Sequence, residues 1–118
     1  YDYPQGGKKQ LWSGLGELFP AQSPMPQQEM IDRLLFVQSL DTVRCLEEGV
    51  LTSVADANIG SVFGWGFAPF HGGTLQFINS YGLDKFIGRA QELEAKYGER
   101  FSVPTLLKDK AAKGEKFV

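Results

Sequence analysis

The chain holds few residues that could carry out acid–base, nucleophilic or metal chemistry. His71 is the only histidine and Cys45 the only cysteine, which excludes a metal site with several histidines and a disulfide within the chain. No carboxylate adjoins His71 in the sequence to orient it as a general base. We therefore interpret His71 as a loop residue that bonds a backbone group, and Cys45 as a small buried hydrophobic side chain.

The other candidates for catalysis lack the surroundings that such chemistry needs. Ser53, Ser61 and Ser80 are not in the Gly-x-Ser-x-Gly context of hydrolase nucleophiles. Glu47 and Glu48 are neighbours at a predicted helix end, where adjacent side chains point in different directions. We interpret all five as structural, and the residues by themselves assign no reaction.

The most informative segment is Gly64–Gly73, which packs four glycines and three aromatic residues into ten positions. Glycines allow positive φ and close backbone approach, and aromatic residues bury a large area. A dinucleotide-binding fingerprint would need a third glycine where Pro69 stands, and a strand instead of a helix before the loop. The segment also lacks the Lys-Ser or Lys-Thr pair of a phosphate-binding loop. We expect a tight, packed loop that binds no cofactor phosphate.

Length and hydrophobic spacing predict one helical domain for the 118 residues. Because no segment alternates with period two, strands are not expected. The predicted fold is all-α, a compact bundle of about five helices with short connections. The predicted helices are a short one within Leu11–Phe19, a long one from Pro26 to Glu48, one from Ser53 to about Val62, one from Leu75 to Tyr81, one from Leu83 to Tyr97, and a last one from Pro104 to Gly114.

The long helix is predicted to be the central element. It is apolar around most of its middle, so neighbours should contact it from several sides. Gly49 is expected to end it in the left-handed conformation, and Ser53 with Asp56 resembles a capping box that opens the next helix. The polar surface that remains on the long helix is predicted to comprise Asp32, Arg33, Gln38, Asp41 and Arg44.

Charge and composition exclude several classes of partner. With Lys+Arg 12 against Asp+Glu 14, the chain has no net positive field for nucleic acid. The lysine run from Lys108 to Lys116 is broken by acidic residues and is interpreted as a solvated helix face. No stretch is apolar enough to span a bilayer, the start has no signal-peptide layout, and a single cysteine suits the reducing cytoplasm. The absence of an initiator Met suggests a fragment.

Two stretches resemble the C-terminal helical domain of the 3-hydroxyacyl-CoA dehydrogenase family: IDRLLFVQSLDTVRCLEEGVLTSVADANIG and GWGFAPFHGGTLQFINSYGLDKF. The shared features are a long helix ending in Glu-Glu-Gly, a short Asp-containing helix, and a Gly-x-Gly-Phe loop closed by two glycines. The sequence of Thr42–Gly49 is most similar to the second of two tandem copies in multifunctional β-oxidation proteins. Tyr1, Asp2 and Tyr3 resemble the tail of the preceding copy. Residues 1–25 are therefore interpreted as a linker that can contain a short helix, and residues 26–118 as the helical domain.

The resemblance implies a fold like the C-terminal domain of 6-phosphogluconate dehydrogenase. It also implies a parent protein that oxidises (3S)-3-hydroxyacyl-CoA with NAD in fatty acid β-oxidation, often with a hydratase domain. In the family, a His–Glu pair of the nucleotide-binding domain and an Asn of the first helical copy do the chemistry. The position that matches this Asn is Asp32, whose carboxylate cannot donate the amide hydrogen bond. No catalytic, cofactor-binding or metal-binding residue is expected in this chain.

The resemblance further implies a bracing role, because single-copy members of the family dimerise through this domain. The expected partners are the preceding helical copy and the nucleotide-binding domain of the same chain. Trp65, Phe67, Phe70 and His71 are the candidate interface residues, with packing into the chain's own core as the alternative for the three aromatic residues. A second function class is an interaction module that binds a thiolase or another subunit. The sequence also allows association between copies of the chain. An independent enzyme is disfavoured, because hydride transfer needs a cofactor-binding fold.

Overall fold

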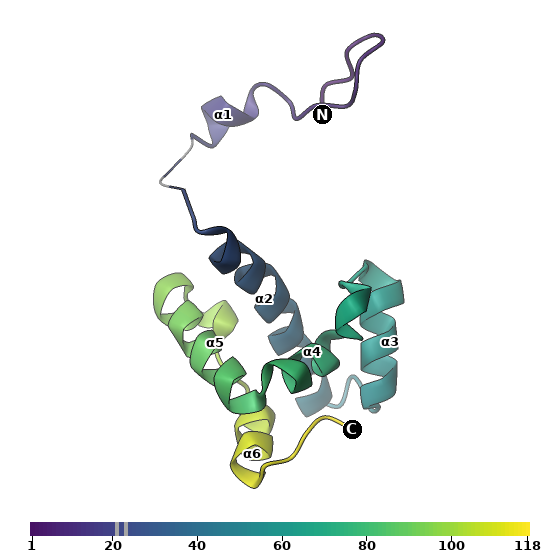
Figure 1. Cartoon of the computed structure of the whole chain (residues 1–118), viewed down its shortest axis with the longest axis vertical. Helices are drawn as coiled ribbons and strands as arrows, with labels where there is room; N and C mark the ends of the chain where they lie inside the picture. Colours follow the sequence, from purple (N-terminus) through teal and green to yellow (C-terminus); the bar gives the residue numbers. More distant parts are fainter. Residues whose placement is uncertain (21, 23) are drawn as a thin grey trace.

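The computed structural model describes residues 1–20, 22 and 24–118 and shows an all-helical chain (Figure 1). These residues form no strand, only one isolated β-bridge, and α2–α6 make up a bundle, which confirms the predicted fold class. None of the described helices is long and apolar enough to cross a lipid bilayer. The elements are α1 (Leu15–Leu18), α2 (Gln27–Glu47), α3 (Val54–Trp65), the 3₁₀ helix η1 (Pro69–His71), α4 (Thr74–Tyr81), α5 (Leu83–Tyr97), the 3₁₀ helix η2 (Glu99–Phe101) and α6 (Thr105–Lys113).

The N-terminal segment buries none of its large apolar side chains. Asp2 and Gln10 pair through their main chains, and α1 is shorter than the helix predicted within Leu11–Phe19. Gly14 and Gly16 account for this difference, since glycine disfavours helix. Figure 1 shows α1 outside the bundle. The exposed apolar residues of this segment are Tyr1, Tyr3, Leu11, Trp12, Leu15, Leu18 and Phe19.

The central helix α2 begins and ends where the sequence predicts. Pro26 stands at its N-cap, and Gly49 follows its C-terminus with φ of +74°. One face of α2 buries Phe36, Leu40 and Val43 against α4, α6 and η2. Burying side chains of this size contributes about 1.5–3 kcal/mol each to folding.

The N-terminal half of α2 differs from the expectation that neighbours surround it. Met30, Ile31 and Leu34 are exposed. The packed elements lie on the other side of the helix, where Phe36 is buried. The prediction that neighbours contact α2 from several sides is therefore wrong for its N-terminal half within this chain.

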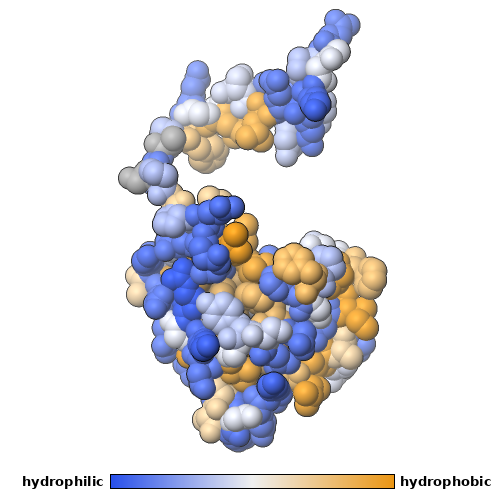
Figure 2. All heavy atoms as spheres, viewed as in Figure 1, coloured by the Kyte–Doolittle hydropathy of each residue, from blue (hydrophilic) through white to orange (hydrophobic). Residues whose placement is uncertain are grey.

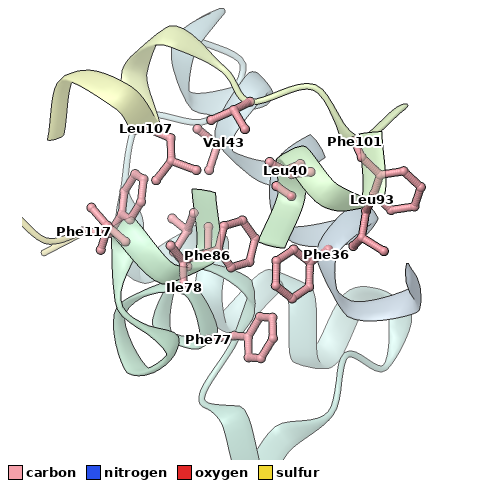
Figure 3. Packing of buried hydrophobic residues seen from close by; sticks show 14 of the residues in the cluster. Phe36, Leu40, Val43, Phe77, Ile78, Phe86, Leu93, Phe101, Leu107 and Phe117 are labelled. Atoms are coloured by element: carbon pink, nitrogen blue, oxygen red, sulfur yellow. The ribbon is translucent and has the colours of Figure 1, made fainter. Parts of the chain in front are cut away.

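Aromatic rings join α2, α4 and α5 at the centre of the core. The ring of Phe36 stacks on that of Phe86 with centroids 4.1 Å apart, and Phe77 and Tyr81 meet Phe36 edge-on. Both arrangements are favourable for aromatic quadrupoles. Figure 3 shows Phe36, Phe77 and Phe86 with the aliphatic residues around them: Leu40, Val43, Ile78, Leu93 and Leu107, with Phe101 and Phe117 at the edges.

Of the capping box predicted before α3, the Ser53 half is present, and the described residues contain no reciprocal bond from the Ser53 amide to the Asp56 carboxylate. The Ser53 hydroxyl accepts a hydrogen bond from the Asp56 amide at 3.2 Å, which satisfies one free N–H of the first turn. The helix continues to Trp65 instead of ending near Val62, so Gly64 is helical and not part of the loop as predicted. Since no side chain limits a glycine, tertiary packing decides its conformation.

Two polar contacts fix the C-terminal part to the rest of the bundle. The Glu47 carboxylate, predicted to be structural, accepts from the Leu106 amide at 2.8 Å and so caps α6. Near the C-terminus, Asn79 donates to the Phe117 carbonyl at 2.8 Å and accepts from the Phe117 amide at 3.0 Å. The Phe117 ring is thereby held in the core.

Candidate protein interface

The Gly64–Gly73 segment is a packed junction between α3 and α4. Gly66 ends α3 in the left-handed conformation, η1 follows, and Gly72 again has positive φ. A Cβ on Gly73 would lie 2.5 Å from the Cα of Asn58, so only glycine permits this approach of the two helices. This local requirement explains the glycine-rich composition.

Side chains of α3 occupy the backbone amides at the start of α4. The Asn58 side-chain oxygen accepts from the amides of Leu75 and Gln76, each at 3.0 Å. The Ser61 hydroxyl accepts from the amide of Thr74 at 3.2 Å. The amides that would otherwise attract an anion at a helix N-terminus are therefore used to hold α3 and α4 together.

Phe67, one of the four candidate interface residues, lies in the core with only 2% of its surface exposed. Its amide donates to the Ser61 carbonyl at 3.0 Å, which turns the chain inward after Gly66. Phe67 therefore cannot serve as a contact residue, and the alternative of core packing is correct for it. The sequence signal was the apolar residue directly after a helix-ending glycine, a position that often packs back onto the helix.

Trp65 remains accessible, with 55% of its surface exposed, and leans toward α2. Its indole N–H donates to the Gln38 side-chain oxygen at 2.9 Å, which fixes the ring orientation. Beside it lies an apolar groove of about 420 Å³, which we call the Trp65 groove. The groove is lined by Gln38, Asp41, Thr42, Cys45, Val50, Leu51 and Trp65.

Cys45 was predicted to be buried. It is only half-buried, because part of its side chain faces this groove. The exposure follows from its place on the side of α2 that meets the open Trp65 groove. Its neighbours there are mostly apolar, which agrees with a hydrophobic role.

Phe70 and His71 lie together on η1. Phe70 is 84% exposed, and the His71 ring centroid lies 4.3 Å from that of Phe70 and 4.7 Å from that of Phe77. The predicted hydrogen bond from His71 to a backbone group is wrong, since the ring forms no hydrogen bond within the described part of the chain. It packs among phenylalanine rings because η1 turns it toward α4.

Two further exposed residues on α3 were not singled out from the sequence. Ile59 and Phe63 are four positions apart, so they lie on one face of the helix, and Phe63 is 86% exposed. Figure 2 shows apolar residues gathered over the side of the bundle that α3 forms in Figure 1. Trp65 lies on another side of α3, toward α2, and Phe70 on η1 after it. We use the name α3 surface for these exposed residues of α3 and η1: Ile59, Phe63, Trp65 and Phe70.

Asp32 is buried, contrary to its predicted place on the polar surface of α2. Its carboxylate accepts from Arg89 Nε of α5 at 2.8 Å and from the Gln28 side-chain amide at 2.8 Å. Arg89 also pairs with Glu92 at 2.7 Å. The Asp32 carboxylate therefore joins α2 to α5.

Glu29 extends this polar network one turn toward the start of α2. It pairs with Lys96 at 2.8 Å and accepts from the Tyr97 hydroxyl. The hydrogen bond from Lys96, with that from Tyr97, lowers the pKa of Glu29, and the same bonds raise the pKa of Lys96 and of Tyr97. The network is a charged clamp between α2 and α5.

Comparisons with known proteins identify relatives of the chain. No family model matches it. The alpha subunit of the fatty acid oxidation complex from Shewanella amazonensis is 39% identical over 89 residues, which is 75% of this chain and 13% of that subunit. The alpha subunit from Vibrio cholerae is 34% identical over 119 residues, which is 99% of this chain and 17% of that subunit. The chain is thus homologous to one part of fatty acid oxidation complex alpha subunits, and it spans less than a fifth of their length.

Proposed function

We propose that the chain is the second of two C-terminal helical copies in an NAD-dependent 3-hydroxyacyl-CoA dehydrogenase of fatty acid β-oxidation, and that it braces the catalytic part. The observation that carries the proposal is the uncovered α3 surface. Several large apolar residues left exposed on one helix and on the turn after it mark a site of contact with protein. The parent subunit is several times longer than the chain and offers such a partner.

The residues of the chain support a structural contribution. Asp32 stands where the family Asn is expected, and Arg89 holds its carboxylate at 2.8 Å. An ionised carboxylate only accepts hydrogen bonds, so it cannot replace an amide donor. In this proposal the catalytic groups and NAD belong to the parent's other domains, in the cytoplasm.

The physical benefit of bracing is geometric. The proposed catalytic cleft lies between the preceding helical copy and the nucleotide-binding domain, and a displacement of about 1 Å there can cost about a hundredfold in rate. A rigid domain packed on the preceding copy limits such displacement. The aromatic core and the charged clamp between α2 and α5 give this chain that rigidity.

The test uses the full-length alpha subunit with Phe63→Asp and Phe70→Asp together. We expect the kcat/KM of the dehydrogenase reaction to fall about tenfold or more, because the cleft loses its support. The hydratase activity, where the subunit carries one, should be unchanged and serves as an internal reference. Val118→Asp, which alters an exposed apolar residue outside the α3 surface, is the matched control. Unchanged dehydrogenase activity in a folded double variant would refute bracing through this surface.

The Trp65 groove favours one alternative, an interaction module for a thiolase or another subunit. It is apolar, open, and flanked by the exposed Val50 and Trp65. Large aromatic residues beside such grooves are frequent anchors for a partner. If Trp65→Ala abolishes co-purification of a partner subunit while dehydrogenase activity stays intact, the alternative holds and bracing does not. Sedimentation at several concentrations distinguishes both from self-association.

A further inference from the structure

The side of α2 that the bundle leaves open carries a second groove, far in sequence from the α3 surface. Met30, Leu34 and Val37 follow one another at helical spacing along it. The opposite wall comes from η2, and the groove has a volume of about 380 Å³. We call it the Arg33 groove, after one of its six lining residues: Met30, Arg33, Leu34, Val37, Arg100 and Phe101.

The Arg33 groove combines apolar walls with unneutralised positive charge. Within the described residues, neither Arg33 nor Arg100 forms an ion pair with a carboxylate. The Arg33 guanidinium lies over the Tyr97 ring at 4.1 Å, and its Nε is buried without a hydrogen-bond partner. A buried donor without a partner costs free energy. The chemistry of the groove therefore calls for an apolar occupant that brings a carboxylate.

The chain itself contains a segment of this chemistry. Residues Leu11–Phe19 carry five large apolar side chains at helical spacing and a single charged residue, Glu17. All five are exposed in the structure, and Figure 2 shows an apolar area on the N-terminal segment. Both the groove and the segment thus lack an apolar partner, and their charges are opposite.

The connection between the two has a suitable length. Residues 20–26 join the segment to α2, and connections of about two to eight residues are usual between antiparallel helices. Seven residues reach about 25 Å when extended. As a helix, Leu11–Phe19 would be about 13 Å long, which matches the stretch of α2 from Met30 to Val37.

We propose that the segment Leu11–Phe19 packs as a helix into the Arg33 groove of the same chain, antiparallel to α2, with Glu17 neutralising Arg33 and Arg100. The apolar half of α2 then gains the cover that its sequence pattern predicts. The Arg33 groove shares no residue with the α3 surface. The test of this packing is therefore independent of the test of the proposed bracing function.

The test reads the exposure of Trp12 in the 118-residue chain. The chain has two tryptophans, so Trp65→Phe leaves Trp12 as the only one, and excitation at a wavelength where tyrosine does not absorb makes it the reporter. We expect Trp12 to be protected from acrylamide quenching. Leu34→Asp, which places a charge in the groove, should raise its quenching constant about threefold, because an undocked indole is open to water. Glu17→Lys should expose Trp12 in the same way.

Ile59→Asp is the matched control, since Ile59 on α3 is exposed to the same degree as Leu34, at 60% against 61%. It should leave the quenching of Trp12 unchanged, and far-ultraviolet circular dichroism checks that each variant is folded. The proposal is overturned if, in the Trp65→Phe chain with no further substitution, acrylamide quenches Trp12 as readily as it does in a peptide of residues 1–25. Protection that increases with protein concentration would also overturn it, since the segment would then bind another copy.

Discussion

Asp32 on α2 and Arg89 on α5 form an ion pair of 2.8 Å inside the bundle. The two residues are 57 positions apart in the sequence, so the pair joins distant parts of the chain. The Asp32 side chain is almost fully buried, and Arg89 retains a second partner in Glu92. The carboxylate thus has a structural task at the position where the resemblance would place a catalytic amide.

Replacing Asp32 by Asn should destabilise the fold. The substitution removes the charge that faces Arg89, and we expect the free energy of unfolding in urea to fall by about 1–2 kcal/mol. Asp41→Asn is the control, because its pair with Arg44 is mostly exposed and should contribute less than about 0.5 kcal/mol. Equal effects of the two substitutions would contradict the assigned role of Asp32.

The contribution of Glu29 should depend on pH. Because its pKa is lowered in the folded chain, its stabilising effect is present above its unfolded pKa of about 4.3 and is lost as the pH falls through the folded pKa. The raised pKa values of Lys96 and Tyr97 act in the opposite sense, so their effect is lost as the pH rises through those values, above about 10.

Glu29→Gln should therefore lower the free energy of unfolding at pH 7, and the difference from the parent chain should shrink as the pH falls through the lowered pKa of Glu29. Denaturant titrations at several pH values measure it. Glu48→Gln is the control, since the exposed Glu48 carboxylate contacts no partner within the described residues. A difference for Glu29→Gln that stays constant with pH would speak against the charged clamp.

Gly73 should tolerate no side chain. An alanine there would place its Cβ 2.5 Å from the Asn58 Cα at φ of +107°, so we expect a loss of about 3 kcal/mol or more in unfolding free energy. Gly60→Ala is the opposite case. Gly60 lies within α3 with nothing close to its Cβ position, and alanine should stabilise the helix by about 0.5–1 kcal/mol. Thermal unfolding of both variants gives the comparison.

Asn58 should matter as an acceptor. Asn58→Ala leaves the amides of Leu75 and Gln76 without their partner and should cost about 1–2 kcal/mol. Asn58→Asp keeps an oxygen there and adds a negative charge at the start of α4, so it should restore most of the stability. If Asp and Ala at this position destabilise equally, the cap is not what Asn58 contributes.

Much of the fold could be predicted from local signals in the sequence. The breaks at Gly49, Gly82, Gly98 and Gly114 were correct, because glycine adopts positive φ at helix ends without strain. The end of α3 was placed three residues early, because Gly64 can be helical or not and only packing decides. Likewise, the burial of Asp32 depends on Arg89, a partner that no local pattern in α2 reveals.

The candidate site was predicted less completely. Trp65 and Phe70 are accessible as an interface requires, whereas Phe67 turns into the core after Gly66. Composition identified the right segment, but the direction of each side chain depends on how η1 is folded. Ile59 and Phe63 were missed because an apolar residue on a helix gives no sign by itself of facing solvent.

Hydrogen exchange of the full-length alpha subunit tests most directly whether the α3 surface is covered by the rest of the protein. We predict that amides of residues 62–71 exchange about tenfold or more slowly in the full-length subunit than in the 118-residue chain. Amides of α6, away from this surface, should exchange at similar rates in both and serve as the reference. Equal rates for residues 62–71 in the two proteins would contradict the bracing role.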